Sequence, residues 1–313
     1  MDRFYAMTAL VAAVDEGSLA GASRRLSRSP AAITRAIASL ERSVSTRLLH
    51  RTTRSVRLTA AGERYLTSCR RILADLEEAE MMAAGERTTP RGVLTVTAPL
   101  VFGRLHVRPI LDAYLALYPA VQVRFLLLDR VVNLIDEGMD AAVRIGHLPD
   151  SGLIAIKTGE VRRVIAASPA YLRRHKPIQE PADLAAHDCI CLSTLTPTDS
   201  WQFAAAGQRD SLRAVRVRPR FAVNEAEAAV ASAVRGHGVT CVLSYQLERE
   251  LNNGQLQLIL DTFAPPPLPV HVIYPETRLS AAKTRTLVEF VVPRLKKVLV
   301  RISARIATAA RRR

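Results

Sequence analysis

Residues 18–49 constrain the fold of this chain most, because they carry the start signals of two short helices separated by a tight polar turn. Ser18 is a typical N-cap for a first helix that ends near Leu26. Ser29 is a second N-cap, and Pro30 follows it at the first helical position, where the missing N–H of proline costs nothing. The stretch therefore predicts a helix-turn-helix.

The second of these helices has two chemically different faces. Its apolar residues recur at spacings of four, three and four, the stripe of an amphipathic helix: Ile33, Ile37, Leu40 and Val44. On the opposite face, Thr34 supplies a hydroxyl and Arg35 a guanidinium fork, which can contact base edges in a major groove. The candidate DNA-contacting residues of this helix are Ser29, Pro30, Ala31, Thr34 and Arg35.

The segment after this helix is typical of a small β-hairpin, or wing. Two short apolar segments, residues 48–49 and 56–58, flank a turn that holds Arg51, Thr52 and Arg54. A wing of this kind places its tip against phosphates or in an adjacent minor groove. The helix pair alone is also compatible with an ordinary solvated surface, and the wing shifts the interpretation to DNA binding.

The positive charge of the chain is concentrated in this region. The formal net charge is +15, and residues 18–72 hold 12 arginines against only Glu41 and Glu63. Such a surface gains non-specific DNA affinity by releasing counterions. A second basic block lies at the end of the chain, where residues 293–313 hold eight basic residues and no acidic ones.

Length and composition bound the remaining possibilities. With 313 residues, 49% of them hydrophobic, the chain can bury two sizeable cores. There is no apolar run long enough for a transmembrane helix and no signal-peptide pattern at the start. The four cysteines lack zinc or disulfide spacing, so we expect a reduced, cytoplasmic protein without membrane partner, cofactor or metal.

The pattern divides the chain into four parts. Residues 1–58 form the winged helix-turn-helix domain, and residues 59–90 a long linker helix. That helix carries Leu66, Cys69, Leu73 and Leu76 at heptad spacing, which predicts pairing with a second copy. Residues 91–292 form the C-terminal domain, and residues 293–313 a basic amphipathic tail.

The sequence pattern of the C-terminal domain predicts a two-lobed α/β fold. Strands at 93–97, 121–128 and 141–145 alternate with helices at 100–117 and 131–137, which favours a mostly parallel sheet. We place lobe 1 at about 91–162 and 268–292, and lobe 2 at about 163–267. Two crossings between two α/β lobes describe a periplasmic-binding-protein-like architecture.

Several stretches resemble a known family. Residues 18–26, 29–40 and 47–62, ending LTAAG, resemble the N-terminal domain of the LysR-type transcriptional regulators, and TAPLVFGRLHVRPIL and DEGMDAAVRIGHLPDSGL resemble their effector domain. The chain departs from the family at Ser27 and Ser45, where glycine is usual, and at Gly21, where a small helix-former is usual. We expect slightly looser packing there. At Pro30, the family commonly has a polar residue such as glutamine.

The resemblance implies a regulator that binds double-stranded promoter DNA at an interrupted palindrome and responds to a small-molecule effector. It also implies a homo-oligomer, a dimer or homotetramer assembled through the linker helix and the effector domains, with RNA polymerase as a further partner. In a two-lobed fold the ligand lies in the cleft, where strand ends meet helix starts. The candidate effector-binding residues are therefore Thr97, Ala98, Pro99, Leu100, Val101, Phe102, Arg144, His147, Thr194, Trp201, Asn224 and Glu225.

The chemistry of this cleft has two interpretations. Leu100 and Val101 stand where many family members have serine or threonine, which favours a more apolar effector than a simple carboxylate. The backbone amides at that helix start can nevertheless hold an anion.

Parts of the sequence also bear on three functions other than regulation. A redox sensor could use Cys189 and Cys191, but we expect these two residues on opposite faces of a predicted strand, which argues against pairing. A small-molecule-binding protein without regulatory role explains residues 91–292 but leaves the N-terminal block unexplained. No catalytic residues are predicted, because the sequence has no triad, metalloprotease or phosphate-loop motif.

The basic tail is compatible with packing on a lobe, touching DNA, lying on an anionic surface or pairing with the acidic stretch 75–86 of another subunit.

Overall fold

The computed structural model describes residues 2–51, 56–83, 89–149, 151–193, 199–205, 208–278 and 281–311. The chain divides into two compact units, Met1–Gly92 and Val93–Arg313. Within the described ranges, none of the helices combines the length and apolar character that crossing a membrane requires.

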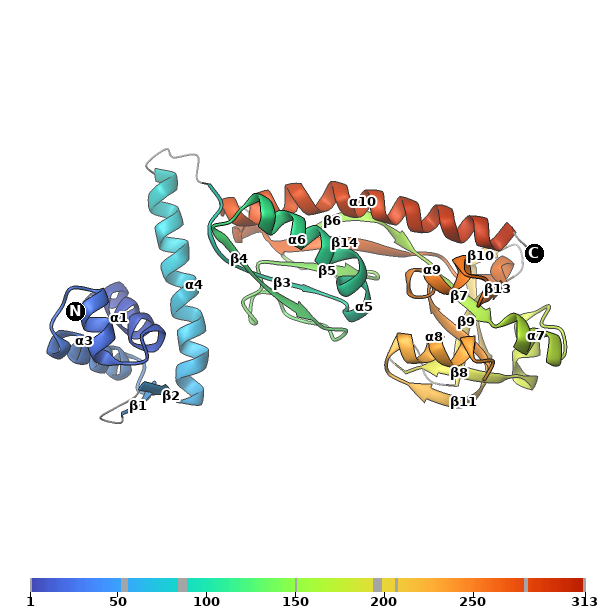
Figure 1. Ribbon diagram of the computed structural model, residues 1–313, viewed down its shortest axis with the longest axis horizontal. Helices are drawn as coiled ribbons and strands as arrows, with labels where there is room; N and C mark the ends of the chain where they lie inside the picture. The colour runs from blue at the N-terminus through green and yellow to red at the C-terminus, as the bar shows by residue number, and fades with distance from the viewer. Residues whose placement is uncertain are drawn as a thin grey trace. The chain divides into compact units, whose positions relative to one another are not determined.

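The first unit is a helical domain with a short two-stranded wing (Figure 1). Its elements are α1 (Arg3–Asp15), α2 (Leu19–Arg25), α3 (Pro30–Ser43), β1 (Leu49–Arg51), β2 (Val56–Leu58) and α4 (Ala60–Ala83). The expected helix starts are confirmed, because the Ser18 hydroxyl accepts from the Gly21 N–H and the Ser29 hydroxyl from the Ala32 N–H. The strands β1 and β2 pair antiparallel, as a wing requires.

Helix α4 contributes to the core of this unit. Leu66 is 6% exposed and Cys69 is fully buried, and both pack in one cluster with Leu10, Ile33 and Ile37. The expectation that the whole heptad seam faces a second copy is therefore wrong for its first two positions. Those positions are used inside the domain itself, because α4 lies against α1.

Lobe 1 of the second unit is built on a five-stranded sheet with the order β4-β3-β5-β14-β6. Its elements are β3 (Gly92–Ala98), α5 (Leu100–Phe102), the π-helical turn η1 (Gly103–Val107), α6 (Arg108–Leu117), β4 (Val121–Leu127), β5 (Ala141–Ile145), β6 (Leu153–Val161) and β14 (Leu268–Pro275). Strands β3 and β5 are parallel, but β14 runs antiparallel to both of its neighbours. The predicted mostly parallel sheet is thus a mixed one. The predicted helix at 131–137 is also wrong, because residues 131–133 have no regular structure, residues 134–138 form turns, and Val131 is 94% exposed.

Lobe 2 holds a second five-stranded sheet, in the order β11-β8-β12-β7-β13, and a hairpin that the sequence did not indicate. Its strands are β7 (Arg163–Ala167), β8 (Asp188–Leu192), β11 (Arg218–Val223), β12 (Val239–Leu243) and β13 (Gln257–Ile259), with the hairpin β9 (Ser200–Ala205) and β10 (Gln208–Arg216). Its helices are α7 (Pro169–Arg174), η2 (Pro181–Ala186), α8 (Ala226–Val234), η3 (Ser244–Gln246), α9 (Glu248–Asn252) and η4 (Asp261–Phe263). This sheet is mixed too, since β12 is parallel to β8 and antiparallel to β7.

The chain ends in one long helix, α10 (Ala282–Arg311), preceded by a short turn, η5 (Glu276–Arg278). The helix continues through Pro293, so the expected boundary at this residue is not a break. Figure 1 shows α10 running along both lobes; it contacts α6 and β6 of lobe 1, and α9 and β13 of lobe 2. Leu299, Ile302 and Ile306 are at most 2% exposed. Of the roles considered for the tail, the structure shows packing on the lobes.

Candidate DNA-binding surface and effector cleft

Helix α3 buries its apolar face and leaves its basic face in solvent. Ile33 and Ile37 are buried, whereas Arg35 on the other side is exposed. Thr34 is half-buried, and its hydroxyl donates to the carbonyl of Pro30 at 2.9 Å, so the lone pairs of this oxygen stay free to accept. Ser29, Pro30 and Ala31 are exposed at the helix start. The exposed side chains are thus accessible to DNA, and contact with DNA stays a prediction.

The carboxylate of Glu41 fastens the wing to α3. It accepts from the backbone N–H of Leu48 at 2.9 Å and from that of Leu49 at 3.1 Å. From the other side, the hydroxyl of Thr59 donates to the carbonyl of Arg47 at 2.8 Å and caps α4 by accepting from the Gly62 N–H. These bonds fix the first wing strand between two helices.

Gly62 allows α4 to pass very close to the wing. A Cβ added at this position would lie 2.0 Å from the carbonyl oxygen of Leu48, a distance that no side chain can occupy. The glycine of the LTAAG stretch is therefore required by a backbone contact.

A groove of about 550 Å³ runs between the end of α3 and the start of the wing. It is lined by Ala38, Glu41, Arg42, Ser45, Thr46, Arg47 and Leu49. Arg42 and Arg47 are exposed, and neither is among the DNA contacts predicted from the sequence, although the helical spacing puts Arg42 on the same face as Thr34 and Arg35. The signal for both is the recurrence of arginine every few residues through this region.

Some arginines of this unit are already neutralised. Arg25 forms an ion pair with Asp15 at 3.3 Å and lies 3.6 Å from a Glu16 oxygen, and Arg70 also pairs with Asp15. Arg51 is the last residue of β1, where its backbone lies opposite Val56, while the predicted contacts Thr52 and Arg54 lie outside the described residues.

The three departures from the family pattern have structural consequences. Ser27 and Ser45 both have φ of 51°, the left-handed region that favours glycine. Gly21 is buried, and a Cβ there would lie 2.6 Å from the Cβ of Glu16. The expected looseness is thus absent around Gly21, which is tightly enclosed.

The helix start at α5 is the first part of the predicted effector cleft. The N–H of Leu100 donates to a carboxylate oxygen of Asp129 at 2.9 Å, so a side chain of the protein itself holds this amide. Thr97 and Ala98 are fully buried, and the hydroxyl of Thr97 has no hydrogen-bond partner in the described part of the chain. Pro99 provides no side-chain cap.

Arg144 lies near this helix start because β3 and β5 are neighbours, with Thr97 opposite Ala142. Its Nη1 donates to the carbonyl of Leu128 at 3.3 Å, and its buried Nη2 has no partner among the described residues. Burial and the nearby Arg130 lower the pKa of Arg144. Half of the guanidinium thus lacks a hydrogen-bond partner within the described ranges, while the predicted His147 is exposed.

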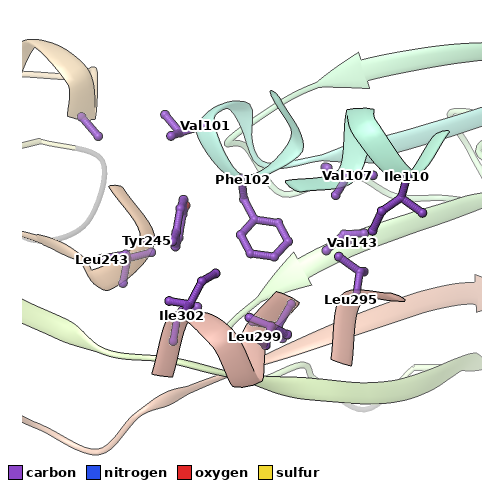
Figure 2. Close-up of a cluster of buried hydrophobic side chains, with 14 of the residues drawn as sticks. Val101, Phe102, Val107, Ile110, Val143, Leu243, Tyr245, Leu295, Leu299 and Ile302 are labelled. Atoms are coloured by element: carbon purple, nitrogen blue, oxygen red, sulfur yellow. The ribbon is translucent and has the colours of Figure 1, made fainter. Parts of the chain in front are cut away.

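The two lobes meet in a cluster of buried apolar side chains that includes Phe102 and Tyr245 (Figure 2). The ring of Phe102 packs edge to face on Tyr245 of η3, and His106 packs against both rings. On the outside, Arg104 forms an ion pair with Glu227 of α8. Val101 is 5% exposed and Phe102 fully buried, so the prediction that Phe102 lines an open cleft is wrong. It belongs to the apolar core that both lobes share.

The predicted residues of lobe 2 do not gather at the cleft. Trp201 is 1% exposed and packs in the core of lobe 2 with Cys191 and Phe203, so its placement at the cleft is corrected. Glu225 is the N-cap of α8, and its carboxylate accepts from two backbone N–H groups of that helix. Asn224 is exposed, and Thr194 lies outside the described residues.

The two cysteines of β8 lie on one side of the strand, which corrects the expected opposite orientation. Cys189 and Cys191 are both buried in the same cluster, because side chains two residues apart on a strand point the same way. Burial raises the pKa of Cys189 to about 12 and that of Cys191 to about 11. Both thiols therefore stay protonated near neutral pH and are poor nucleophiles.

Comparison with known proteins agrees with this architecture. Residues 4–63 match the family described as bacterial regulatory helix-turn-helix protein, lysR family, and residues 87–296 match the LysR substrate binding domain. The probable HTH-type transcriptional regulator LtrA of Klebsiella pneumoniae is 34% identical over 249 residues, 79% of each chain. The HTH-type transcriptional regulator DmlR of Escherichia coli is 31% identical over 272 residues, 87% of each chain.

Two solved structures align with this chain over more than nine-tenths of its length. The LysR-type regulator CrgA from Neisseria meningitidis aligns with a TM-score of 0.59 at 26% identity, covering 93% of this chain and 98% of CrgA. The full-length Vibrio cholerae virulence activator AphB aligns with a TM-score of 0.59 at 26% identity, covering 94% and 99% of the two chains.

Proposed function

The chain belongs to the LysR family of bacterial transcriptional regulators, and from this premise we propose how its residues engage DNA and effector. Helix α3 enters the major groove, with Thr34 and Arg35 at base edges and Ser29, Pro30 and Ala31 at the entry of the helix. The wing residues Arg51, Thr52 and Arg54 contact phosphates or the adjacent minor groove.

The observation that carries this proposal is the opposite orientation of Ile33 and Arg35. Ile33 is fully buried, while Arg35 is exposed and has no ion-pair partner among the described residues. Arg42 and Arg47 extend the same basic surface along the groove between α3 and the wing. A guanidinium held on a packed helix loses little freedom when it pairs with guanine.

Sequencing of the genomic fragments that the purified chain retains tests this proposal. We expect enrichment of promoter fragments that share an interrupted palindrome, retained more strongly than random DNA of equal length. Retention that depends only on fragment length would refute sequence-specific binding by this surface.

We propose that the chain acts as a homo-oligomer, a dimer or tetramer. Because Leu66 and Cys69 are buried in their own domain, pairing of α4 must use its later positions, such as the half-buried Leu73 and Leu76. Light scattering of the full chain tests the assembly, and a monomer at all concentrations would exclude it. We propose further that the protein acts in the cytoplasm and that it contacts RNA polymerase at the promoters it binds.

The effector is proposed to bind between the Thr97 hydroxyl and the Arg144 guanidinium, which are partly unpaired. Because Asp129 holds the Leu100 amide, an anionic effector would have to displace this carboxylate. Calorimetry with small carboxylates against an apolar aromatic series tests the class. Replacing Asp129 by Ala should strengthen carboxylate binding; unchanged binding of both series would contradict an anion at this helix start.

A further inference from the structure

A hollow with its own set of lining residues lies between the last turns of α10 and the α9–β13 segment of lobe 2. Its volume is about 730 Å³, within the range of roughly 300–1,000 Å³ that small-molecule sites occupy. It is lined by Pro169, Leu251, Asn252, Asn253, Gly254, Leu256, Gln257, Leu258, Arg301, Ala304, Arg305, Thr308 and Ala309. We call this hollow the α10 groove.

The charge of the α10 groove is positive. Two arginines, Arg301 and Arg305, lie in its wall, and no aspartate or glutamate is among its lining residues. Arg305 pairs with Glu248 outside the lining, which holds its side chain in place. Arg301 is exposed and makes no hydrogen bond or ion pair within the described part of the chain. One planar guanidinium is therefore free to take a carboxylate in a two-pronged contact.

The floor of the α10 groove is apolar. Leu256 and Leu258 are 3% and 2% exposed, and Ala304 and Ala309 lie opposite them on α10. Exposed amide side chains at the rim, those of Asn252 and Gln257, can donate to further oxygens. A ligand that fits both the basic wall and the apolar floor of the groove has a carboxylate attached to an apolar body.

The α10 groove is separate from the effector cleft. Of the predicted effector-binding residues that the structure describes, none lines it. Its α10 wall, residues 301–309, also lies beyond residue 296, where the match to the substrate-binding domain family ends.

We propose that the α10 groove is a second small-molecule site, which binds organic carboxylates with an apolar body. The site joins the two lobes, because α10 packs on β6 of lobe 1 with Leu299 and contacts α9 and β13 of lobe 2 beyond it. Figure 2 shows Leu295, Leu299 and Ile302 of this helix beneath Phe102 and Tyr245. A ligand held between Arg301 and β13 adds a contact that holds α10 on lobe 2, and so restrains the angle between the lobes.

Calorimetry on the full chain tests this site with benzoate, phenylacetate and 2-naphthoate, each compared with its neutral amide. We expect the carboxylates to bind and the amides to bind more weakly. Arg301→Gln should weaken carboxylate binding about tenfold or more, since a hydrogen-bonded charge pair is lost. Ala304→Phe should also weaken it by filling the groove without a change of charge.

Two control variants make the result specific. Lys297→Gln removes the same charge one turn earlier on α10, at an exposed residue outside the groove, and should leave binding within about twofold of the parent chain. Arg144→Gln removes carboxylate binding only at the proposed effector cleft, so the binding that Arg301→Gln weakens should persist in this variant. No binding by any carboxylate would overturn the proposal. Equal loss in the Arg301 and Lys297 variants, or loss only in the Arg144 variant, would overturn it as well.

Discussion

The rings of Phe102 and Tyr245 meet edge to face with their centroids 5.1 Å apart, and this contact joins lobe 1 to lobe 2. Both residues belong to one apolar cluster that continues from the β3 sheet through α10 into lobe 2. The two lobes therefore share a core at their junction, and a change of the angle between them has to disturb this aromatic contact.

Replacing both rings tests the strength of the junction. Phe102→Leu and Tyr245→Leu should each destabilise the protein, and a double-mutant cycle should give about 0.5–1.5 kcal/mol of coupling for the lost aromatic pair. Urea unfolding followed by the fluorescence of Trp201, the single tryptophan, measures this. Additive effects of the two changes would show that the rings do not interact.

His106 makes the stability of this junction depend on pH. Burial lowers the pKa of His106 from 6.5 to about 4, with the nearby Arg301 also lowering it and Glu248 opposing the shift. Between these two pKa values, His106 is protonated in the unfolded chain and neutral in the folded chain. The free energy of unfolding is therefore highest above about pH 6.5 and decreases as the pH falls towards 4.

The decrease should reach about 3 kcal/mol at most. Unfolding of the parent chain and of His106→Gln at several pH values measures it. The difference between the two chains should be constant above pH 6.5 and change below it; a constant difference down to pH 4 would contradict a buried neutral imidazole.

Glu41 should be a stability determinant of the wing. Glu41→Ala leaves the N–H groups of Leu48 and Leu49 without their carboxylate, which costs about 1–3 kcal/mol. Glu41→Gln keeps an acceptor oxygen at the same position and should lose less. Hydrogen exchange at the two amides checks the mechanism, since faster exchange in Glu41→Gln than in Glu41→Ala would exclude it.

Ser27 and Ser45 offer a route to greater stability. Since both serines have left-handed backbone at φ of 51°, glycine at either site should stabilise the domain by about 0.5–1 kcal/mol, after its larger entropy in the unfolded chain is deducted. Ser43→Gly, inside the last turn of α3, is the matched control and should destabilise by a similar amount. Thermal unfolding compares the three variants; a lower Tm for both Ser27→Gly and Ser45→Gly would contradict backbone strain.

Arg35 and Arg57 should contribute to DNA binding in different ways. Arg35→Ala should cost about 1–3 kcal/mol at the cognate site and relax sequence preference, since a base contact is lost. Arg57 of the wing is exposed, and Arg57→Ala should weaken cognate and random DNA about equally and flatten the salt dependence. Fluorescence anisotropy at several salt concentrations measures both variants. The same loss of discrimination in each would contradict this division of roles.

Local signals in the sequence predicted the DNA-binding domain well. The caps at Ser18 and Ser29 act on backbone groups two or three residues away, and the stripe from Ile33 to Leu40 buries one face of one helix. Each of these features depends only on residues that are close in the sequence, so it can be predicted from the sequence alone.

The effector domain was harder to predict because its contacts are long-range. Trp201 and Phe102 were assigned to the cleft from their positions after strands, but both are buried by partners far away in sequence, such as Tyr245 for Phe102. The direction of β14 follows from the return of the chain after lobe 2, which no local pattern encodes. The error at Cys189 and Cys191 was of another kind, since the two-residue period of a strand already places them on one face.

The absence of room for a Cβ at Gly62 has a mechanical consequence. Because the carbonyl oxygen of Leu48 fills the place of a side chain at Gly62, and Thr59 bonds to the neighbouring carbonyl of Arg47, the wing cannot slide along the start of α4. A rotation of the first turn of α4 therefore has to carry with it the segment that leads into β1. That strand belongs to the wing that is proposed to contact DNA.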